Sequence, residues 1–269
     1  MKLSISGIGF VGAALADWDE AADALRNGRE PGHMPLDELG RALKADRLPR
    51  TERRRAGKST RLAMTACWEA VEAAGIDPAT LPMVFASSTG DTEVLTHSCA
   101  SLAETERMIS PIRFHNSVHN AASGYWSISV GAQEPATAIA AHNETAAVGL
   151  LEAGMQATLG NRPVLLVVYD LPFPEPMHQA EPISEPLAIA LVIQPAREGE
   201  GDQLNIELAA VTDRGDPAMA DPAWERLRRE VPTGRLLPLL EAMGRGEPRE
   251  FLLALDGTIG LDLSYQPKS

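Results

Sequence analysis

Apolar and polar positions alternate along this chain in short blocks, and the spacing switches repeatedly between the strand and helix periods. Lys2–Ile8 predicts a buried strand, and Thr60–Ala74 repeats apolar residues at helical spacing until Gly75, a helix-ending glycine. Leu81–Ala86 predicts another strand, which runs into the turn Ser87–Gly90. Strands that alternate with helices in this way indicate a layered α/β fold.

The middle of the chain has the clearest pattern. Pro135–Ala141 alternates like a strand and passes without a loop into Thr145–Thr158, a predicted helix with almost no polar face. A helix that is apolar all round is expected at the centre of the molecule. Pro163–Val168 predicts a fully buried strand, and Pro172–Pro186 holds five prolines and is expected to be a loop.

The remaining elements are predicted by the same two periods. Helices are expected at Asp17–Asn27, Val94–Met108, Asn116–Val130, Ala223–Glu230 and Leu236–Met243. Strands are expected at Leu187–Ile193, Leu204–Val211, Phe251–Leu255 and Gly260–Tyr265. Between Leu36 and Arg61 the sequence is polar and carries a run of basic residues.

Composition narrows the functional classes. The 269 residues, 44% of them hydrophobic, suffice for a sizeable core, and the net charge of -13 argues against general nucleic-acid binding. Two cysteines make no disulfide framework, which fits a reducing compartment and predicts a cytoplasmic location. No apolar run reaches the length of a membrane span.

Two features of the first residues have competing interpretations. Met1–Ala16 resembles a short secretory signal, but its serines and glycines favour a first buried strand. Gly7, Gly9 and Gly12 fit the GxGxxG pattern of dinucleotide-binding proteins. That fingerprint also needs a second strand with an acidic end about 20 residues later, and no β-rich run follows until Leu81. A tight turn is favoured, and dinucleotide binding stays as an alternative.

Between Ile109 and Gly160, a set of residues has the same order and spacing as a segment of one known protein family. Its members are Ile109-Ser110-Pro111, Asn120, Gly124, Gly131, Pro135, the strand Thr137–Ala141 and Gly160. In this combination, without a gap, the segment resembles the nucleophile region of β-ketoacyl synthases; Ser4–Gly12 and Ser87–Gly90 also resemble that family. The resemblance implies a thiolase-like layered fold, with a βαβαβ core and a mixed sheet. It further implies one domain over 1–269, with an N-terminal half over 1–170 and a reduced C-terminal half over 171–269.

At the position where the family carries its active cysteine, this chain has Asn143, between His142 and Glu144. A carboxamide cannot attack a thioester as a thiolate does. The family also takes two histidines from its C-terminal half, whereas no histidine follows His178 here. The chain therefore resembles the non-catalytic chain-length-factor subunits, and its short form resembles those of bacterial aryl-polyene clusters. No cofactor is expected.

The same resemblance implies two partners, a ketosynthase subunit and an acyl carrier protein. The ketosynthase interface and its acyl tunnel are expected at Arg113, Phe114, Ser117, Val118, Thr137 and Ile139. Carrier docking is expected at Arg53, Arg54, Arg55 and Lys58, which in an acidic chain would attract an acidic partner. A solvated helix start explains the same basic run without any partner.

Other interpretations remain open. A decarboxylase or acyltransferase could use Asn143 and an oxyanion site without a covalent intermediate. His115, His119 and His142 suggest a metal site, with the first two on one helix face, although a structural role is favoured. Cys99 with His97 or His119 suggests a thiol dyad, although a small buried thiol is favoured.

Overall fold

The computed structural model describes residues 1–43, 46–197, 201–211 and 217–268. The strands follow in chain order: β1 (Lys2–Gly12), β2 (Met83–Ala86), β3 (Ala136–Ile139), β4 (Val164–Asp170), β5 (Leu187–Pro195), β6 (Gln203–Ala210), β7 (Arg249–Ala254) and β8 (Ile259–Gln266). The α-helices are α1 (Trp18–Asn27), α2 (Leu36–Ala42), α3 (Arg50–Arg55), α4 (Lys58–Ala74), α5 (Thr92–Ala103), α6 (Pro111–His115), α7 (Ala121–Val130), α8 (Thr145–Gly160), α9 (Pro222–Glu230) and α10 (Leu237–Arg245). Short 3₁₀ helices are η1 (Pro78–Thr80), η2 (His142–Glu144), η3 (Met177–Gln179) and η4 (Pro232–Leu236).

The described strands form one mixed sheet in the order β3-β2-β4-β5-β1-β6-β8-β7. β2 pairs in parallel with β3 and β4, and the remaining pairs are antiparallel. β1 pairs with β6 only through Lys2 and Leu3, so the sheet divides into a five-stranded part and a three-stranded part. The predicted mixed sheet of a thiolase-like fold is confirmed.

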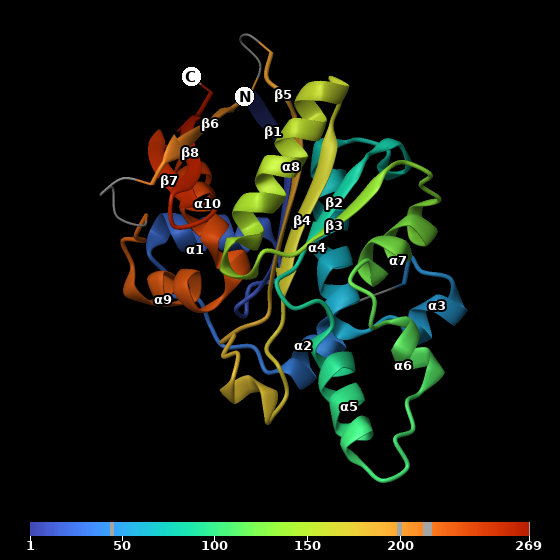
Figure 1. Cartoon of the computed structure of the whole chain (residues 1–269). Coiled ribbons are helices and arrows are strands. Elements are labelled where there is room, and N and C mark those ends of the chain that lie inside the picture. Colours follow the sequence, from blue (N-terminus) through green and yellow to red (C-terminus); the bar gives the residue numbers. More distant parts are fainter. Residues whose placement is uncertain (44–45, 198–200, 212–216, 269) are drawn as a thin grey trace.

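The helices and the two parts of the sheet stack in four layers (Figure 1). α4 and α7 cover one face of the five-stranded part, and α8 covers the other face. η4 and α10 lie beside α8, and the three-stranded part lies beyond them. The predicted central position of the apolar helix α8 is therefore confirmed, since sheet residues pack on both of its sides.

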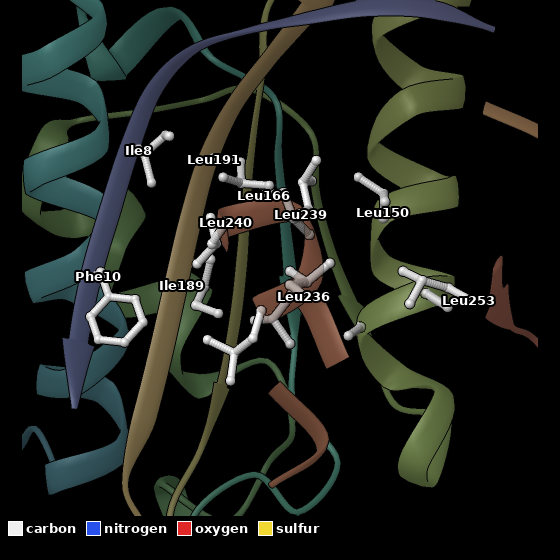
Figure 2. Packing of buried hydrophobic residues seen from close by; sticks show 14 of the residues in the cluster. Ile8, Phe10, Leu150, Leu166, Ile189, Leu191, Leu236, Leu239, Leu240 and Leu253 are labelled. Atoms are coloured by element: carbon white, nitrogen blue, oxygen red, sulfur yellow. The ribbon is translucent and has the colours of Figure 1, made fainter. Parts of the chain in front are cut away.

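Two apolar clusters occupy the two faces of the five-stranded part. Along β4, Leu166 and Val168 join the cluster on the α8 side, whereas Leu165 and Val167 join the cluster on the α4 side. This alternation is the period of a strand that is buried on both faces. Figure 2 shows the first cluster, in which Leu150 of α8 lies between Leu166 of the sheet and Leu253 of β7 (Figure 2).

The glycines of the GxGxxG pattern lie within β1, where they let a helix approach closely. A Cβ atom at Gly7 would lie 2.0 Å from the Ala70 carbonyl oxygen, and one at Gly9 would lie 2.0 Å from that of Ala66. Both carbonyls belong to α4, which packs across β1. Helix α1 begins only at Trp18, so these glycines do not open a phosphate-binding helix. Close helix-to-strand packing accounts for the pattern.

Several predicted boundaries differ from the structure. The polar stretch 36–61 contains the short helices α2 and α3. The helix predicted at Val94–Met108 ends at Ala103, and Arg107 has a left-handed φ of +50°. The helix predicted at Asn116–Val130 begins only at Ala121. There the Asn116 side chain is buried, donating to the Arg55 carbonyl (2.7 Å) and accepting from the Tyr125 hydroxyl (3.0 Å).

The fully buried carboxylate of Asp170, at the end of β4, connects three distant segments. Ser88, in the turn after β2, donates its backbone N–H (2.9 Å) and its hydroxyl (2.6 Å) to Oδ1. Thr233, in η4, donates the same two groups to Oδ2, at 3.0 and 2.7 Å. Burial raises the pKa of this carboxyl, while these donors act in the opposite direction.

Replacing Asp170 by alanine is expected to lower the free energy of unfolding by about 2–4 kcal/mol, because buried donors of Ser88 and Thr233 lose their acceptor. Urea denaturation measures the change. The control Asp19→Ala removes an exposed carboxyl from the first turn of α1 and is expected to shift stability by under about 0.5 kcal/mol. Equal effects of the two substitutions would contradict the structural role of Asp170.

Candidate functional site

Asn143 lies at the junction between the sheet and the central helix. It is the middle residue of η2, which links β3 to α8, and its side chain is exposed. His142 has a left-handed φ of +51°, so the chain turns sharply just before Asn143. Thr145, fully buried, holds this turn: its hydroxyl donates to the His142 carbonyl (2.7 Å) and accepts from the Ala141 N–H (2.9 Å).

The position of Asn143 suits a nucleophile, but its side chain does not. Glu144 is the N-cap of α8 and makes no side-chain capping hydrogen bond, so backbone N–H groups and the positive end of the helix dipole lie beside Asn143. At such a place the pKa of a cysteine would be lowered. An amide has no proton to lose at physiological pH and is a poor nucleophile. The arrangement can polarise a bound carbonyl but offers no group at residue 143 for covalent attachment.

A pocket of about 170 Å³ opens beside Asn143. Its lining includes Glu144 and Ala147 from the α8 end, Arg235 from η4, and Leu253 with Ala254 from β7. The sequence analysis did not identify Arg235, although it is the one charged residue in the stretch Val231–Leu240. The two halves of the chain thus meet at Asn143.

His142 points toward the proline-rich loop between β4 and β5. Its Nδ1 atom lies 4.0 Å from Oε1 of Glu181, and both side chains are exposed. This is a solvent-exposed contact, which contributes little to stability. The side chains of His142 and Glu144, the sequence neighbours of Asn143, form no hydrogen bond with Asn143 in the described part of the chain.

The residues predicted to face a ketosynthase fall into two groups. Phe114 in α6 and Val118 in the following turn are 65% and 53% exposed. Thr137 and Ile139 in β3 instead contact their own chain: the Thr137 hydroxyl accepts from Gln156 of α8 (3.1 Å), and Ile139 packs on the core. The His119 ring, at Nε2, lies 3.0 Å from the Ile139 carbonyl and joins the two groups.

Ser117 and Arg113, the other two residues predicted to face a ketosynthase, are exposed like Phe114 and Val118. Ser117 donates its hydroxyl to the Phe114 carbonyl (2.8 Å), which leaves its Cβ side exposed. Arg113 is exposed on α6 and lines a cleft against α5.

The residues predicted to dock a carrier protein lie where α3 ends and α4 begins. Arg53, Arg54 and Arg55 belong to α3, and Lys58 begins α4. Three of the four form ion pairs within the chain: Arg53 with Asp46 (3.1 Å), Arg55 with Glu52 (3.7 Å) and Lys58 with Glu93 (2.6 Å). Arg54 is exposed and has no such pair with the described residues. The basic surface is therefore weaker than the sequence suggests.

The histidine and cysteine predictions change in the structure. His115 ends α6 and His119 lies in the next turn, so the two do not share a helix face. Within the described ranges, His, Cys, Asp and Glu side chains form no group of three suited to a metal ion. The prediction that Cys99 is buried is wrong, because it lies on the exposed side of α5; Cys67 is the buried thiol, and burial raises its pKa.

Among the helices of the described chain, none combines the length and apolar character that a membrane crossing requires.

Solved structures with the same fold are ketosynthases and their complexes. A chain of the complex of the ketosynthase ApeO with its chain length factor ApeC from Xenorhabdus doucetiae superposes with a TM-score of 0.70 at 22% identity, covering 98% of this chain and 99% of that one. A chain of the ishigamide ketosynthase/chain length factor gives 0.70 at 14% identity, with full coverage of both chains (100% each). A beta-ketoacyl synthase from Burkholderia phymatum STM815 gives 0.68 at 13% identity, covering 99% of each. At these identities the likeness establishes the fold.

A comparison with curated proteins found no match. The family model described as "Beta-ketoacyl synthase, N-terminal domain" matches residues 17–233, which include β3, the Asn143 turn, α8 and both hydrogen-bond partners of Asp170, Ser88 and Thr233. Since that match spans most of the 269 residues, the chain belongs to the β-ketoacyl synthase family.

Proposed function

We propose that this chain is a non-catalytic subunit of chain-length-factor type, which pairs with an active ketosynthase and shapes its acyl tunnel. The observation that carries the proposal is Asn143, an amide at the mouth of α8 where a nucleophile would have to lie. The similarity to chains from ketosynthase/chain-length-factor complexes supports the same role. The segment Asn116-Ser117-Val118-His119-Asn120, followed by Gly124-Tyr125-Trp126, resembles the chain-length-factor-type proteins of bacterial aryl-polyene clusters, which supports a product of the aryl-polyene class.

The surface around β3 supports pairing with a second protein. β3 is the terminal strand of the sheet, so its outer edge has no neighbour among the described strands. α7 and α8 both contact β3, and each helix exposes large apolar side chains, Ile128 on α7 and Met155 and Leu159 on α8. An open strand edge between exposed apolar side chains is a liability unless another chain covers it. A ketosynthase with the same fold offers a matching edge.

The segment around α6 supports a role in product length. Phe114 and Val118 are large, apolar and exposed, and they lie near the β3 edge through the His119 contact to Ile139. Once β3 pairs with a partner, these side chains would face that partner. Bulk at Ser117, between them in sequence, would then restrict the space for the acyl chain.

Covalent labelling tests the absence of a nucleophile. With a labelled malonyl or acyl donor on a carrier protein, mass spectrometry of the complex is expected to show acyl groups on the ketosynthase and none on this subunit. Asn143→Cys is expected to acquire the label, because the α8 terminus favours the thiolate, whereas the control Asn143→Ala stays unlabelled. Label on the unmodified chain, or release of CO₂ from malonyl-carrier protein by this chain alone, would show that it is itself an enzyme.

The β3 surface is tested by a charge at Leu159, which is 81% exposed at the end of α8. Leu159→Glu is expected to weaken a 1:1 complex with the co-expressed ketosynthase by at least about tenfold, because a charge would be buried without a partner. The control Leu208→Glu, at a 66% exposed leucine on β6, is expected to leave the affinity within about twofold. Similar effects of the two variants in size-exclusion and calorimetric measurements would place the interface elsewhere.

The tunnel role is tested by Ser117→Trp in the assembled complex. The product distribution, measured by mass spectrometry, is expected to shift toward shorter chains while the complex still forms. Asn120→Gln, a polar change at the N-cap of α7 farther along the turn, is the control. Unchanged product lengths with Ser117→Trp would remove this position from the tunnel.

A further inference from the structure

Large apolar side chains are exposed on one projecting segment of the chain, residues 92–118, which we call the arm. It consists of α5, α6 and the connections around them, and it extends beyond the end of the sheet (Figure 1). Of the eleven large apolar side chains that are exposed in the described part of the chain, the arm carries Leu95, Leu102, Met108, Ile112, Phe114 and Val118. Such a concentration of exposed apolar side chains marks an interaction site.

One face of α5 carries an apolar stripe. Leu95, Cys99 and Leu102 are exposed and follow one another at spacings of four and three residues, which places them on one side of the helix. Neither leucine belongs to the two apolar clusters of the described core, and none of the three residues lines the cleft between α5 and α6. The stripe is therefore left largely uncovered by its own chain.

The start of α5, in contrast, is fixed to the rest of the molecule. The carboxylate of Asp91, the N-cap, accepts from the Ser59 hydroxyl of α4 (2.9 Å). The Thr92 hydroxyl donates to the Pro172 carbonyl in the loop after β4 (3.0 Å). These contacts fix the start of the helix, so the stripe has a defined position relative to the sheet.

The two ends of the arm lie next to the end of β3. A Cβ atom at Gly90, just before the N-cap of α5, would lie 3.3 Å from Nδ1 of His119, which follows the arm. Nε2 of the same ring lies 3.0 Å from the Ile139 carbonyl at the end of β3. The β3 edge and the arm are therefore neighbouring parts of the molecule, and one partner can contact both.

The β3 edge is too small to hold a partner by itself. Stable, specific interfaces bury about 800 Å² on each protein, from roughly 20–30 residues. β3 has four residues, and the exposed side chains on α7 and α8 add Ile128, Met155 and Leu159. The arm is the remaining concentration of exposed large apolar side chains, because among those described only Leu208 on β6 and Ile259 on β8 lie elsewhere.

We propose that the apolar stripe of α5 is the second half of the ketosynthase-binding surface, so that the arm and the β3 edge contact the same partner. The identity of that partner rests on the proposed function. A second copy of this chain is a less suitable occupant, because two molecules that each carry a net charge of -13 repel one another. The stripe itself is uncharged and has a thiol, Cys99, at its centre.

The first experiment uses Cys99 as a probe of the stripe. Cys67 is buried and the pKa of its thiol is raised, so iodoacetamide is expected to label Cys99 first in the free chain. In the 1:1 complex with the co-expressed ketosynthase, the labelling rate at Cys99, followed by mass spectrometry, is expected to fall at least about tenfold, because interface cores exclude water. The control Leu208→Cys places an exposed thiol on β6, where the rate is expected to change by under about twofold.

The second experiment places a charge on each side of α5. Leu102→Glu is expected to weaken the complex at least about tenfold, because the charge would be buried against the partner. The matched control Ala100→Glu adds the same charge on the side of α5 that lines the cleft and is expected to change the affinity by under about twofold. Circular dichroism and thermal unfolding verify that each variant is folded.

The outcomes separate this surface from the proposed subunit role. If the complex forms but Cys99 is labelled as fast as in the free chain, or if Leu102→Glu has no more effect than Ala100→Glu, the stripe lies outside the interface while the subunit role stands. If no complex forms with the ketosynthase, both proposals fail. If Cys99 becomes protected as the concentration of this chain alone is raised, the occupant is a second copy, which overturns the ketosynthase assignment.

Discussion

The buried carboxylate of Asp170 determines how the two parts of this molecule meet. Placing a carboxyl group in an apolar interior is unfavourable unless donors surround it, and here Ser88 and Thr233 provide them. Because Ser88 follows β2 and Thr233 lies in η4, the same contacts fix the C-terminal segment against the end of the five-stranded part. Arg235, two residues after Thr233, reaches the Asn143 pocket as a consequence.

The turn at Asn143 shows which features at the start of α8 come from the backbone and which depend on the side chain of residue 143. The turn at His142 and the hydrogen bonds of the Thr145 hydroxyl do not involve the side chain of residue 143, so they persist with any small side chain there. The chemistry depends on the side chain alone. A scaffold role therefore needs no change of fold, which is consistent with the family membership and with the structural likeness to chains from ketosynthase/chain-length-factor complexes.

The sheet ends differently on its two sides. At one end β3 is the terminal strand, and α7 and α8, which contact it, expose Ile128, Met155 and Leu159. At the other end the three-stranded part β6-β8-β7 packs its inner face on α8 and α10, and its outer face carries Glu207 and Glu250.

The sequence alone determined the strands, the longer helices, the central position of α8 and the amide at residue 143, because periodicity and apolar composition are local properties; it missed the short helices α2, α3 and α6. It did not determine where α7 begins. The Asn116 side chain is held by the carbonyl of Arg55, 61 residues earlier, and by the hydroxyl of Tyr125 within α7. Nor did the sequence indicate that Cys99 is exposed, that most of the basic residues near α3 are ion-paired, or that Arg235 lines the Asn143 pocket. The contacts of Asn116 with Arg55 and of Lys58 with Glu93 join residues far apart in sequence, and only the tertiary structure decides which side chains meet.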